Sequence, residues 1–324
     1  MNAVGIIMPH MMRQLADIHD NDDRNIVSVA SLEIASMFRC VDIVLDNMVN
    51  SGIENILCIP NSRDDMAYVG NLEWCRPVIS NDVDNYLNAC NEEYVIVSYA
   101  GSICRIDYEE VLSKHILKNA DVTYLTNDSN EYMGCFVISK ENCLKLFKNI
   151  NNNVQNRSIN LLPDTFEIFN KMKYNIMGSK NELCYMIGEY GRMISDMTSY
   201  YKVNMEFLNS EVRHVFRKKP EIHTVFKDNS PAKYNELAKV CNSIISNGCV
   251  INGAVDNSVI FDEVYIGHNS KIKNSVILDD VYIGDNTHIE NCIIESHDTI
   301  RANSYYVGEN EIKIVVERND RYVI

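Results

Sequence analysis

The last third of the chain contains a sequence repeat. Four similar segments, VCNSII, VDNSVI, IKNSVI and IENCII, begin at Val240, Val255, Ile272 and Ile289, so the last two intervals are identical and the first is slightly shorter. A near-constant period is typical of solenoids, in which each repeat buries its apolar face against its neighbours. This repeat constrains the fold more strongly than any other feature, because the register is kept residue by residue between copies.

Each repeat divides into three stretches of about six residues, which is the pattern of a triangular coil. One aliphatic residue in each stretch is expected to point inward, and residues that tolerate left-handed backbone geometry are expected near the corners. Gly267, Gly284, Asn269 and Asn286 suit the corners. The asparagines expected to form a ladder between coils are Asn242, Asn257, Asn274 and Asn291. The repeat therefore predicts a parallel β-helix of the hexapeptide kind.

Two other interpretations of the repeat remain open. Hairpins in an ordinary β-sandwich also contain short strands, but hairpins do not require a residue-level period. A hexapeptide acyltransferase uses a histidine on a coil face as a general base, and His268, His288 and His297 lie in the repeat. Because exposed coil histidines are more often inert surface residues, the acyltransferase is kept as an alternative.

The segment 1–225 alternates between strand and helix patterns, which predicts an α/β fold around a mostly parallel sheet. Strands are expected at 3–8, 55–60 and 94–100, and helices at 41–53 and 108–119. Asp107 precedes the second helix and Glu110 follows three positions later, so a capping box is expected there. A chain of 324 residues is long enough for two domains, which are expected at 1–225 and 226–324.

The composition excludes several partners and locations. The formal net charge of -15 repels nucleic acids and anionic membrane surfaces. The 11 cysteines form no C-x-x-C pair, which is typical of reduced thiols in the cytoplasm. The N-terminal segment lacks the pattern of a secretion signal, and no apolar run reaches the length of a membrane span. The sequence therefore predicts a cytoplasmic protein with no nucleic-acid and no membrane partner.

Several segments spread along nearly the whole chain match one known family. They include VDIVLDNMVNSGIENILCI, YVIVSYAGSICRIDYEEVLSKHILKNADVTYLT, MGCFVIS, SYYKVNMEFLN and PAKYNELAKVCNSIISNGCVINGAVDNSVIF. In this order they resemble segments of glucose-1-phosphate adenylyltransferases, also called ADP-glucose pyrophosphorylases. Ala100-Gly101-Ser102 resembles the GlgD-type branch of that family, which has Gly-Ser where catalytic subunits have Gly-Asp.

The resemblance implies an α/β, Rossmann-like nucleotidyltransferase (sugar-nucleotide transferase) domain, followed by a left-handed parallel β-helix of hexapeptide repeats with C-terminal strands. It also implies a role in bacterial glycogen biosynthesis. The family reaction joins ATP to glucose 1-phosphate with Mg²⁺ and releases pyrophosphate. The resemblance also implies assembly as tetramers, in which catalytic and regulatory subunits can be mixed.

The same resemblance indicates where the catalytic groups should stand, and the first two are missing. The family's phosphate-binding loop, of the type G-G-x-G-T-R-L, is matched by MPHMMRQL, which begins Met8-Pro9 and contains no glycine. Without glycine the backbone does not come close enough to cradle a phosphate. The family's metal-binding aspartate is matched by Gly101 or Ser102, and neither supplies a carboxylate to Mg²⁺.

Three further family positions point the same way. The Glu-Lys-Pro loop that reaches the sugar phosphate is matched by the short segment 127–132, which has no lysine. The W-R-D-V-G tract is matched by 191–195, in which Arg192 is kept and Met193 replaces the aspartate. The glycine-rich entry tract is matched by 31–36, again without Gly-Gly.

These losses predict a degenerate site in a non-catalytic, regulatory subunit, because no group remains to stabilise the transition state. We therefore expect no catalytic residue, no metal ligand and no cofactor in this chain. The alternative is an active but divergent nucleotidyltransferase that makes ADP-glucose from ATP and glucose 1-phosphate.

The expected function then lies in contacts with other molecules. The resemblance implies a homo-oligomer, or a hetero-oligomer with a catalytic subunit, and the exposed coils and the terminal segment 311–317 are expected contact surfaces because open strand edges need covering. Arg39 matches a family arginine beside a pocket for a small anionic effector. Arg192 is a second candidate, as a remnant of the pocket. A solvated arginine and a structural ion pair are the simpler explanations of these two residues.

Overall fold

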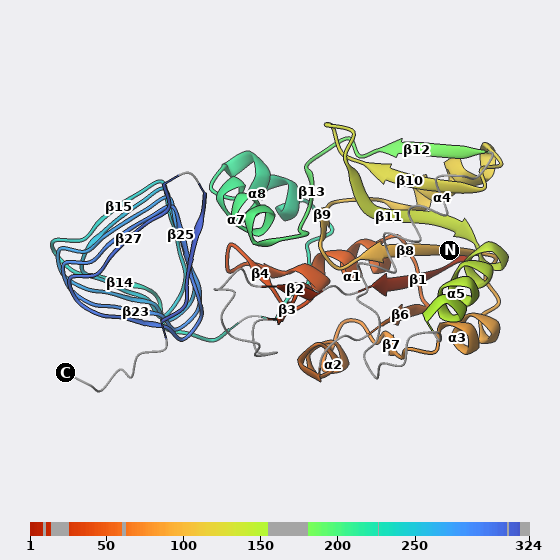
Figure 1. Ribbon diagram of the computed structural model, residues 1–324. Helices are drawn as coiled ribbons and strands as arrows, with labels where there is room; N and C mark the ends of the chain where they lie inside the picture. The colour runs from red at the N-terminus through yellow and green to blue at the C-terminus, as the bar shows by residue number, and fades with distance from the viewer. Residues whose placement is uncertain are drawn as a thin grey trace.

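The computed structural model describes residues 1–8, 11–13, 26–59, 63–154, 181–225, 227–309 and 311–317. An α/β part holds the N-terminus, and a β-helix follows it in the chain and in space (Figure 1). The described residues contain no helix that is long and apolar enough to cross a membrane.

The α/β part is built on a seven-stranded sheet with the strand order β12-β10-β11-β8-β1-β6-β7. Its strands are β1 (Ala3–Met8), β6 (Ile56–Cys58), β7 (Val78–Ile79), β8 (Tyr94–Tyr99), β10 (Val122–Thr126), β11 (Tyr132–Ser139) and β12 (Glu182–Met186). β1 pairs in parallel with β6 and β8, and β11 is antiparallel to β8 and β10. The predicted mostly parallel sheet is confirmed.

Helices cover both faces of this sheet. They are α1 (Cys40–Asn50), α2 (Arg63–Gly70), α3 (Val83–Ala89), α4 (Tyr108–Leu117) and α5 (Lys140–Val154). Val44 of α1 and Val111 of α4 belong to the apolar cluster on one face, whereas Leu87 of α3 and Phe147 of α5 belong to the cluster on the other face. The first face is therefore covered by α1, α4 and α2, which adds Val69 to the same cluster, and the second face by α3 and α5.

The ends of α1 and α4 show how the sequence sets these helices. α1 ends in a Schellman motif, in which Gly52 has φ 77° and the amides of Gly52 and Ile53 donate to Val49 and Met48. Asp107 caps α4 as predicted, by accepting a hydrogen bond from the amide of Glu109 at 2.9 Å. The predicted capping box does not form, because Glu110 instead pairs with a lysine one turn on at 2.7 Å.

Smaller elements connect the sheet to the β-helix. Three two-stranded sheets pair β2 (Met11–Arg13) with β3 (Ile26–Ser28), β4 (Glu33–Ile34) with β5 (Phe38–Arg39), and β9 (Ser102–Cys104) with β13 (Gly191–Met193). Two helices follow, α7 (Met197–Glu206) and α8 (Ser210–Arg217). The linker between α8 and the β-helix covers residues 218–225 and 227–232.

The C-terminal third forms five coils, which stack into three parallel five-stranded sheets. The first sheet contains β14 (Lys233–Tyr234), β17 (Val250–Ile251), β20 (Tyr265–Ile266), β23 (Tyr282–Ile283) and β26 (Thr299–Ile300). The second contains β15 (Lys239–Cys241), β18 (Ala254–Asp256), β21 (Lys271–Lys273), β24 (His288–Glu290) and β27 (Tyr305–Val307). The third, called the junction sheet below, contains β16 (Ile244–Ile245), β19 (Val259–Ile260), β22 (Val276–Ile277), β25 (Cys292–Ile294) and β28 (Lys313–Val315). This architecture is the predicted left-handed β-helix.

The strand register confirms the repeat alignment made from the sequence. Val240 pairs with Val255, which pairs with Ile272, which pairs with Ile289. The asparagine ladder is present too, since all four asparagines have φ between 41° and 54° and their side-chain amides join at 2.7, 2.8 and 3.2 Å. Left-handed backbone and inter-coil hydrogen bonds therefore coincide at one corner.

The corner residues Asn269 and Asn286 have positive φ as predicted, but the two corner glycines are needed for a different reason. Gly267 and Gly284 are not in the left-handed region. A Cβ on Gly267 would lie 2.7 Å from the amide nitrogen of Asp285, and a Cβ on Gly284 would lie 2.5 Å from that of Ala302. Glycine is required at both places because the next coil passes too closely for a side chain.

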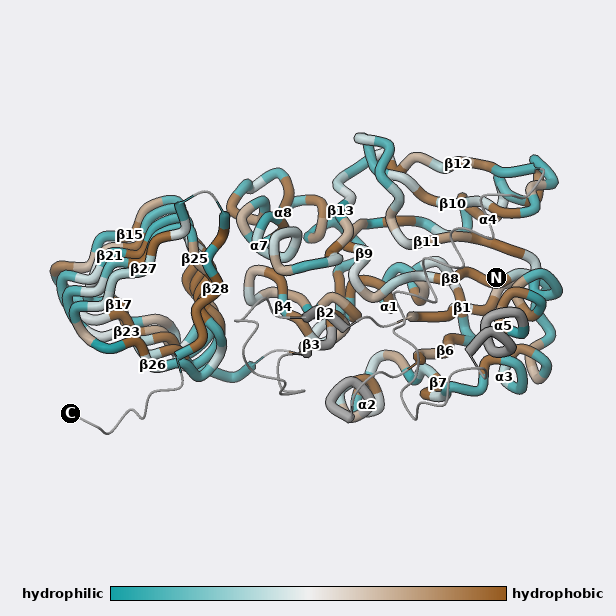
Figure 2. Tube along the Cα trace, in the orientation of Figure 1, coloured by the Kyte–Doolittle hydropathy of each residue, from teal (hydrophilic) through white to brown (hydrophobic). Residues whose placement is uncertain are grey.

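An apolar cluster, called the junction cluster below, joins the two parts. Its members from the α/β side include Tyr200 and Val203 of α7 and Phe216 of α8, and its members from the junction sheet include Val259 and Val276. The apolar colour of β25 and β28 in Figure 2 marks the side of the β-helix that faces α7 and α8. Part of the predicted contact segment 311–317 is used here, because the side chain of Ile314 packs against the same cluster.

We predict that Gly267→Ala destabilises the protein by ~1–3 kcal/mol, because the added methyl group meets the backbone of the next coil. Gly188→Ala is the matched control, since a Cβ at Gly188 meets nothing within 4 Å. Urea unfolding followed by circular dichroism measures both variants. Equal stability of the two would contradict the close approach between coils.

Candidate functional site

The carboxyl ends of β1 and β8 lie side by side, where a nucleotide would approach a sheet of this kind. Met8 pairs with Tyr99 in the sheet, and its carbonyl oxygen accepts a hydrogen bond from the amide of Ala100 at 2.9 Å. The side chain of Met8 is buried, so the end of β1 presents an apolar group. Pro9, the next position of the lost phosphate loop, lies outside the described residues.

The two positions matched to family aspartates meet at these strand ends. Ser102 of β9 pairs with Met193 of β13, and both lie beside Gly134, where a Cβ would be 3.1 Å from Ser102 Oγ and 3.5 Å from Met193 Sδ. Gly101 leaves no room for a side chain, since its Cβ would lie 2.5 Å from the carbonyl oxygen of Ile194. The structure therefore brings together two positions that are far apart in the sequence.

Magnesium does not fit the residues at this place. Ser102 Oγ is buried and donates to the carbonyl oxygen of Met133 at 2.5 Å. The thioether of Met193 is a soft, weak ligand, whereas Mg²⁺ requires hard oxygen ligands. Neither position supplies the carboxylate that the family reaction uses to hold the metal.

The loop matched to the lysine-bearing loop of the family closes on itself. The side-chain oxygen of Asn127 accepts hydrogen bonds from the backbone amides of Ser129 and Glu131 at 3.0 and 2.8 Å. The backbone amide of Asn127 donates to the carbonyl oxygen of Glu131. The result is a tight connection between β10 and β11. This loop is therefore a short turn held by its own hydrogen bonds, with residues 128–131 exposed.

Arg192 forms a structural ion pair. Its Nε lies 3.1 Å from the carboxylate of Glu206 on α7, and its Nη1 donates to the carbonyl oxygen of Gly191 at 2.8 Å. The hydroxyl of Tyr190 donates to the same carboxylate at 2.6 Å. The contacts of Arg192 match the simpler explanation, and this residue is not among those that line the cavity described next.

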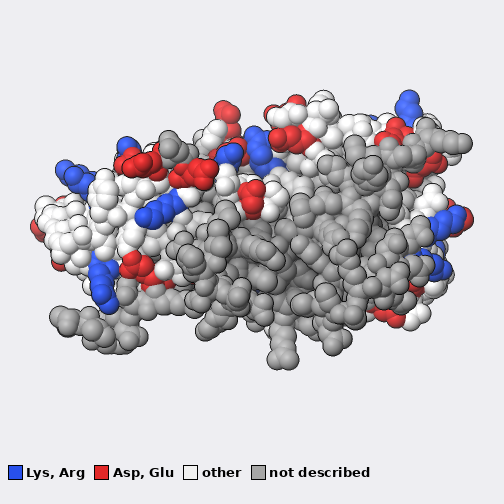
Figure 3. Space-filling model, viewed as in Figure 1, with Lys and Arg blue, Asp and Glu red and all other residues white. Residues whose placement is uncertain are grey.

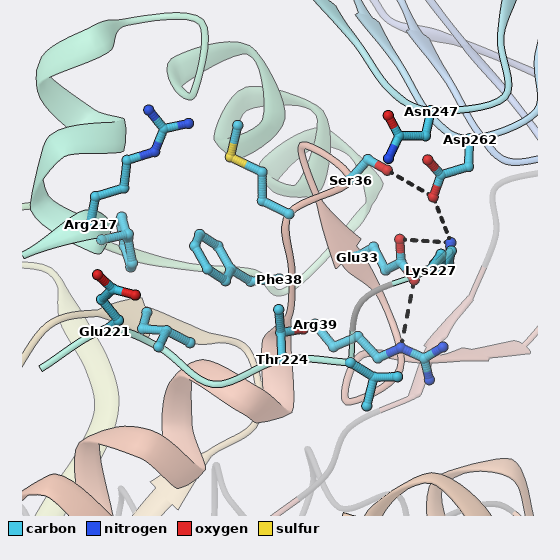
Figure 4. Close-up of a pocket in the computed structure, with 14 residues that line it drawn as sticks. Glu33, Ser36, Phe38, Arg39, Arg217, Glu221, Thr224, Lys227, Asn247 and Asp262 are labelled. Carbon is cyan, nitrogen blue, oxygen red and sulfur yellow. Dashed lines mark hydrogen bonds and ion pairs between the residues drawn. The ribbon is translucent and has the colours of Figure 1, made fainter. Parts of the chain in front are cut away.

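A cavity of about 530 Å³, called the junction cavity below, lies between the α/β part, the linker and the β-helix (Figure 4). Its apolar wall includes Phe38 and Phe216. Its charged lining residues are balanced in number: Arg39, Arg217, Lys227, Glu33, Glu221 and Asp262. The volume is within the range of small-molecule sites.

Arg39 lines the junction cavity at the start of α1. Its guanidinium carbon lies 3.9 Å from the ring centroid of Tyr68, which is the distance of a cation–π contact. Its Nε lies 3.6 Å from Glu33. Arg39 therefore lines a cavity between the two parts and is already engaged by an aromatic ring and a carboxylate.

Lys227 of the linker stands among three carboxylates at the edge of the cavity. Its ammonium nitrogen lies 3.1 Å from oxygens of Glu33, Asp262 and Asp279. Burial alone would lower the pKa of Lys227, but the charges of Glu33 and Asp279 reverse this and raise it above its ordinary value. Among the described residues, these three acids are also close enough to share a metal ion, but the lysine lies between them.

Two buried aspartates on α1 hold the linker. Asp42 accepts hydrogen bonds from the hydroxyls of Thr224 and Tyr68 at 2.7 and 2.8 Å, and Asp46 accepts from the amide and the ring of His223 at 2.7 and 2.9 Å. Burial raises the pKa of both carboxyl groups, and these hydrogen bonds offset part of the increase. The linker is thus a fixed element of the cavity wall.

The coil histidines do not converge. His268 lies 3.6 Å from Asp285, His288 stacks on Tyr305 in the second sheet, and His297 is at the corner beyond the junction sheet. Because they occupy different sides of the coils, they do not form a common site with a shared substrate position.

Sequence reasoning found Arg39 but missed the lysine–carboxylate group beside it. Asp262 and Asp279 occupy the same place in consecutive repeats, so the repeat alignment could have shown that they stack. Lys227 and Glu33 carried no such signal, because only the tertiary fold brings them to that corner.

The fold and the strand-end geometry define an α/β nucleotidyltransferase-like protein with a C-terminal left-handed β-helix. Residues 228–314 match the GlmU-like, C-terminal hexapeptide family. The chain is also similar to the protein named glycogen biosynthesis protein GlgD in Bacillus subtilis (strain 168), with 24% identity over 274 residues that cover 76% of each chain.

Further relatives support the same resemblance. GlgD of Geobacillus stearothermophilus is 25% identical over 276 residues, covering 76% of each chain. The glucose-1-phosphate adenylyltransferase of Bacillus subtilis (strain 168) is 25% identical over 297 residues, covering 75% of this chain and 78% of its own. These matches confirm the resemblance to the glucose-1-phosphate adenylyltransferase family and to its GlgD branch.

We predict that Asp42→Asn changes the pH dependence of stability. Because burial raises the pKa of Asp42 above its value in the unfolded chain, its contribution is fully favourable below the unfolded-state pKa and declines as the pH rises through the folded-state pKa. Lowering the pH from neutrality toward pH ~4 should therefore stabilise the unsubstituted protein relative to the variant.

Urea unfolding of both proteins at the two pH values measures this difference. Asp256→Asn, which removes an exposed carboxylate, is the control. A difference between the unsubstituted protein and Asp42→Asn that is the same at both pH values would contradict the raised pKa.

Proposed function

We propose that this protein is a glycogen-biosynthesis protein that does not catalyse adenylyl transfer itself and acts by binding a catalytic glucose-1-phosphate adenylyltransferase subunit. The named relatives support the role in glycogen biosynthesis. A cytoplasmic location accords with this role and stays a prediction.

The pairing of Ser102 with Met193 carries the proposal of inactivity. Two positions matched to family aspartates meet at the strand ends, as a metal site requires, and neither has a carboxylate. Phosphoryl-type transfer depends on positioned cations and donors that neutralise developing charge. A site without the metal ligands, the loop glycines and the lysine lacks each of these sources of stabilisation.

The exposed first coil supports the proposal of association. Within the described residues, β14, β15 and β16 are each paired on one side only. The apolar residues Tyr234, Leu237 and Val240 on this coil are 53%, 75% and 39% exposed. Solenoid ends normally carry polar caps, and unpaired strand edges attract other strands. The partner that fits three edges in a triangle is another β-helix, either of a second copy or of the catalytic homologue.

The charge distribution agrees with a protein partner. On the face shown in Figure 3, positive and negative groups are interspersed over the described residues of the β-helix. A small effector is also part of the proposal, and the junction cavity is its place. Because acids and bases balance there, an anionic effector would depend on Arg39 and Arg217 to offset the repulsion of Glu33 and Glu221.

Two alternatives from the sequence remain as competing functions. A divergent nucleotidyltransferase would need ligands other than Ser102 and Met193 for its metal. A coil-based acyltransferase would need a histidine in a substrate groove, and the described positions of His268, His288 and His297 on different sides of the coils disfavour it.

We predict that the isolated protein, supplied with ATP, Mg²⁺ and glucose 1-phosphate, releases pyrophosphate at least ~1,000-fold more slowly than a catalytic homologue from the same source, because transition-state stabilisation is missing. Mixing the two proteins should give co-elution from a sizing column and a changed kcat or KM of the homologue. Turnover by the isolated protein comparable to the homologue would disprove inactivity, and unchanged kinetics without co-elution would disprove the regulatory role.

We predict that Leu237→Asp lowers the oligomeric mass or the affinity for the catalytic homologue, because it places a charge on the exposed apolar coil. Leu117→Asp is the matched control, since Leu117 is a similarly exposed leucine, 80% accessible, on α4. Analytical ultracentrifugation of both variants, alone and with the homologue, measures the effect. An identical mass and affinity for the two variants would remove the first coil as the contact surface.

A further inference from the structure

The apolar contact between the β-helix and the α/β part is nearly the same in every coil. The outward column of the junction sheet consists of aliphatic residues: Ile244, Val259, Val276, Ile293 and Ile314. Apolar attraction is non-directional, so a displacement by one coil, about 4.8 Å, would still place an aliphatic residue against α7 and α8. This column alone does not determine which coils dock.

The polar contact from α7 is equally repetitive. The hydroxyl of Tyr201 donates to the carbonyl oxygen of Asn274 at 2.6 Å. Asn257 and Asn291 occupy the same ladder position in the neighbouring coils, where the carbonyl oxygen of Asn291 already accepts a hydrogen bond from the amide of Lys313 at 3.1 Å. A displacement by one coil that brings Asn257 to Tyr201 would therefore keep this hydrogen bond.

The second and third residues after each residue of this column differ between coils, whereas the first is always an isoleucine in the four coils compared next. The second coil has Val-Ile-Phe-Asp at 259–262 and the third has Val-Ile-Leu-Asp at 276–279. The first coil has Ile-Ile-Ser-Asn at 244–247, and the fourth has Ile-Ile-Glu-Ser at 293–296. The fifth coil has Ile-Val-Val-Glu at 314–317, so an apolar residue followed by an aspartate occurs in two adjacent coils only at the second and third.

Both features of the middle coils are used at the junction. Phe261 is buried in the junction cluster and Leu278 packs against it. Asp262 and Asp279 receive Lys227 between them, at 3.1 Å from each. Ser36 of the α/β part also donates to Asp262, at 3.3 Å.

Lys227 is in turn fixed to the α/β part. It contacts Glu33 at 3.1 Å, and the linker residues just before it are held by Asp42 and Asp46 of α1. The ammonium group is therefore a charge at a set position, and it can pair with two carboxylates in one alignment of the coils only. A shift by one coil would replace one aspartate by Asn247 or Ser296.

We infer that Val-Ile-(Phe/Leu)-Asp in the second and third coils is a docking signature, and that Lys227 is the positioning residue that selects it and sets the register of the β-helix on the α/β part. This register determines where the exposed first coil stands relative to the strand-end site. The inference goes beyond the proposed function and holds whether or not the protein is catalytic.

Two substitutions test this role, each with a matched control. Lys227→Met removes the positive charge that lies between Asp262 and Asp279. Asp279→Asn removes one of these two carboxylates. Lys273→Met breaks an ion pair of 2.9 Å with Glu290 inside the second sheet, and Asp280→Asn removes the neighbouring carboxylate, which faces His297. Hydroxyl-radical footprinting of the full chain reports the exposure of Phe261 and Leu278. The fluorescence of Trp74 reports the order of the linker, because this ring stacks on His223.

We expect Lys227→Met and Asp279→Asn to raise the labelling of Phe261 and Leu278 at least about twofold and to change the Trp74 emission, while both controls leave these signals unchanged. The melting temperature of Lys227→Met should fall by roughly 5 °C, because three carboxylates are left facing one another. Lys227→Arg keeps the charge and should restore the labelling pattern. Labelling of Phe261 and Leu278 that matches the controls in folded Lys227→Met and Asp279→Asn would overturn the inference.

Discussion

The packing of the junction sheet against α7 and α8 is the contact on which the rest of the arrangement depends. A coil of a β-helix buries its inner residues against its neighbours, but Val259 and Val276 on its outer side would be exposed without the junction cluster. Burying them places the linker between the two parts. The junction cavity and the contacts of Lys227 lie where that apolar contact brings the two parts together.

The α/β scaffold and its chemistry are separable in this chain. The sheet order, the helices on both faces and the cap at Asp107 are all present. At the strand ends, however, neither of the carboxylates that the family match predicts is present. The Ser102 hydroxyl, which donates to a carbonyl oxygen, occupies one position, and the Met193 thioether occupies the other. A core tolerates such changes because the Ser102 hydroxyl is satisfied by a hydrogen bond and the apolar thioether of Met193 requires none. A metal site does not tolerate them, because it depends on the ligand atoms themselves.

Several buried or half-buried acidic groups lie at the junction instead. Asp42 and Asp46 are buried on α1 and hold the linker, and Glu33, Asp262 and Asp279 surround Lys227. Buried and half-buried ionic groups contribute little net stability when they are paired, but they penalise any arrangement that leaves them unpaired. Their distribution favours one alignment of the two parts, which apolar packing between repeated coils would not select.

The sequence alone determined the β-helix, because a repeat that keeps its asparagines at fixed places admits one stacking register, and it determined the loss of family carboxylates at Ser102 and Met193. Only the tertiary structure showed that Gly267 is required by a neighbouring coil, that Arg192 is held by Glu206, and that Lys227 lies between Asp262 and Asp279. Local patterns report the residues within one repeat or one helix. Contacts such as those of Arg192 with Glu206, or of Lys227 with Glu33, join groups that are distant in the sequence. They depend on how the finished elements pack, and these residues carry no periodic signal in the chain.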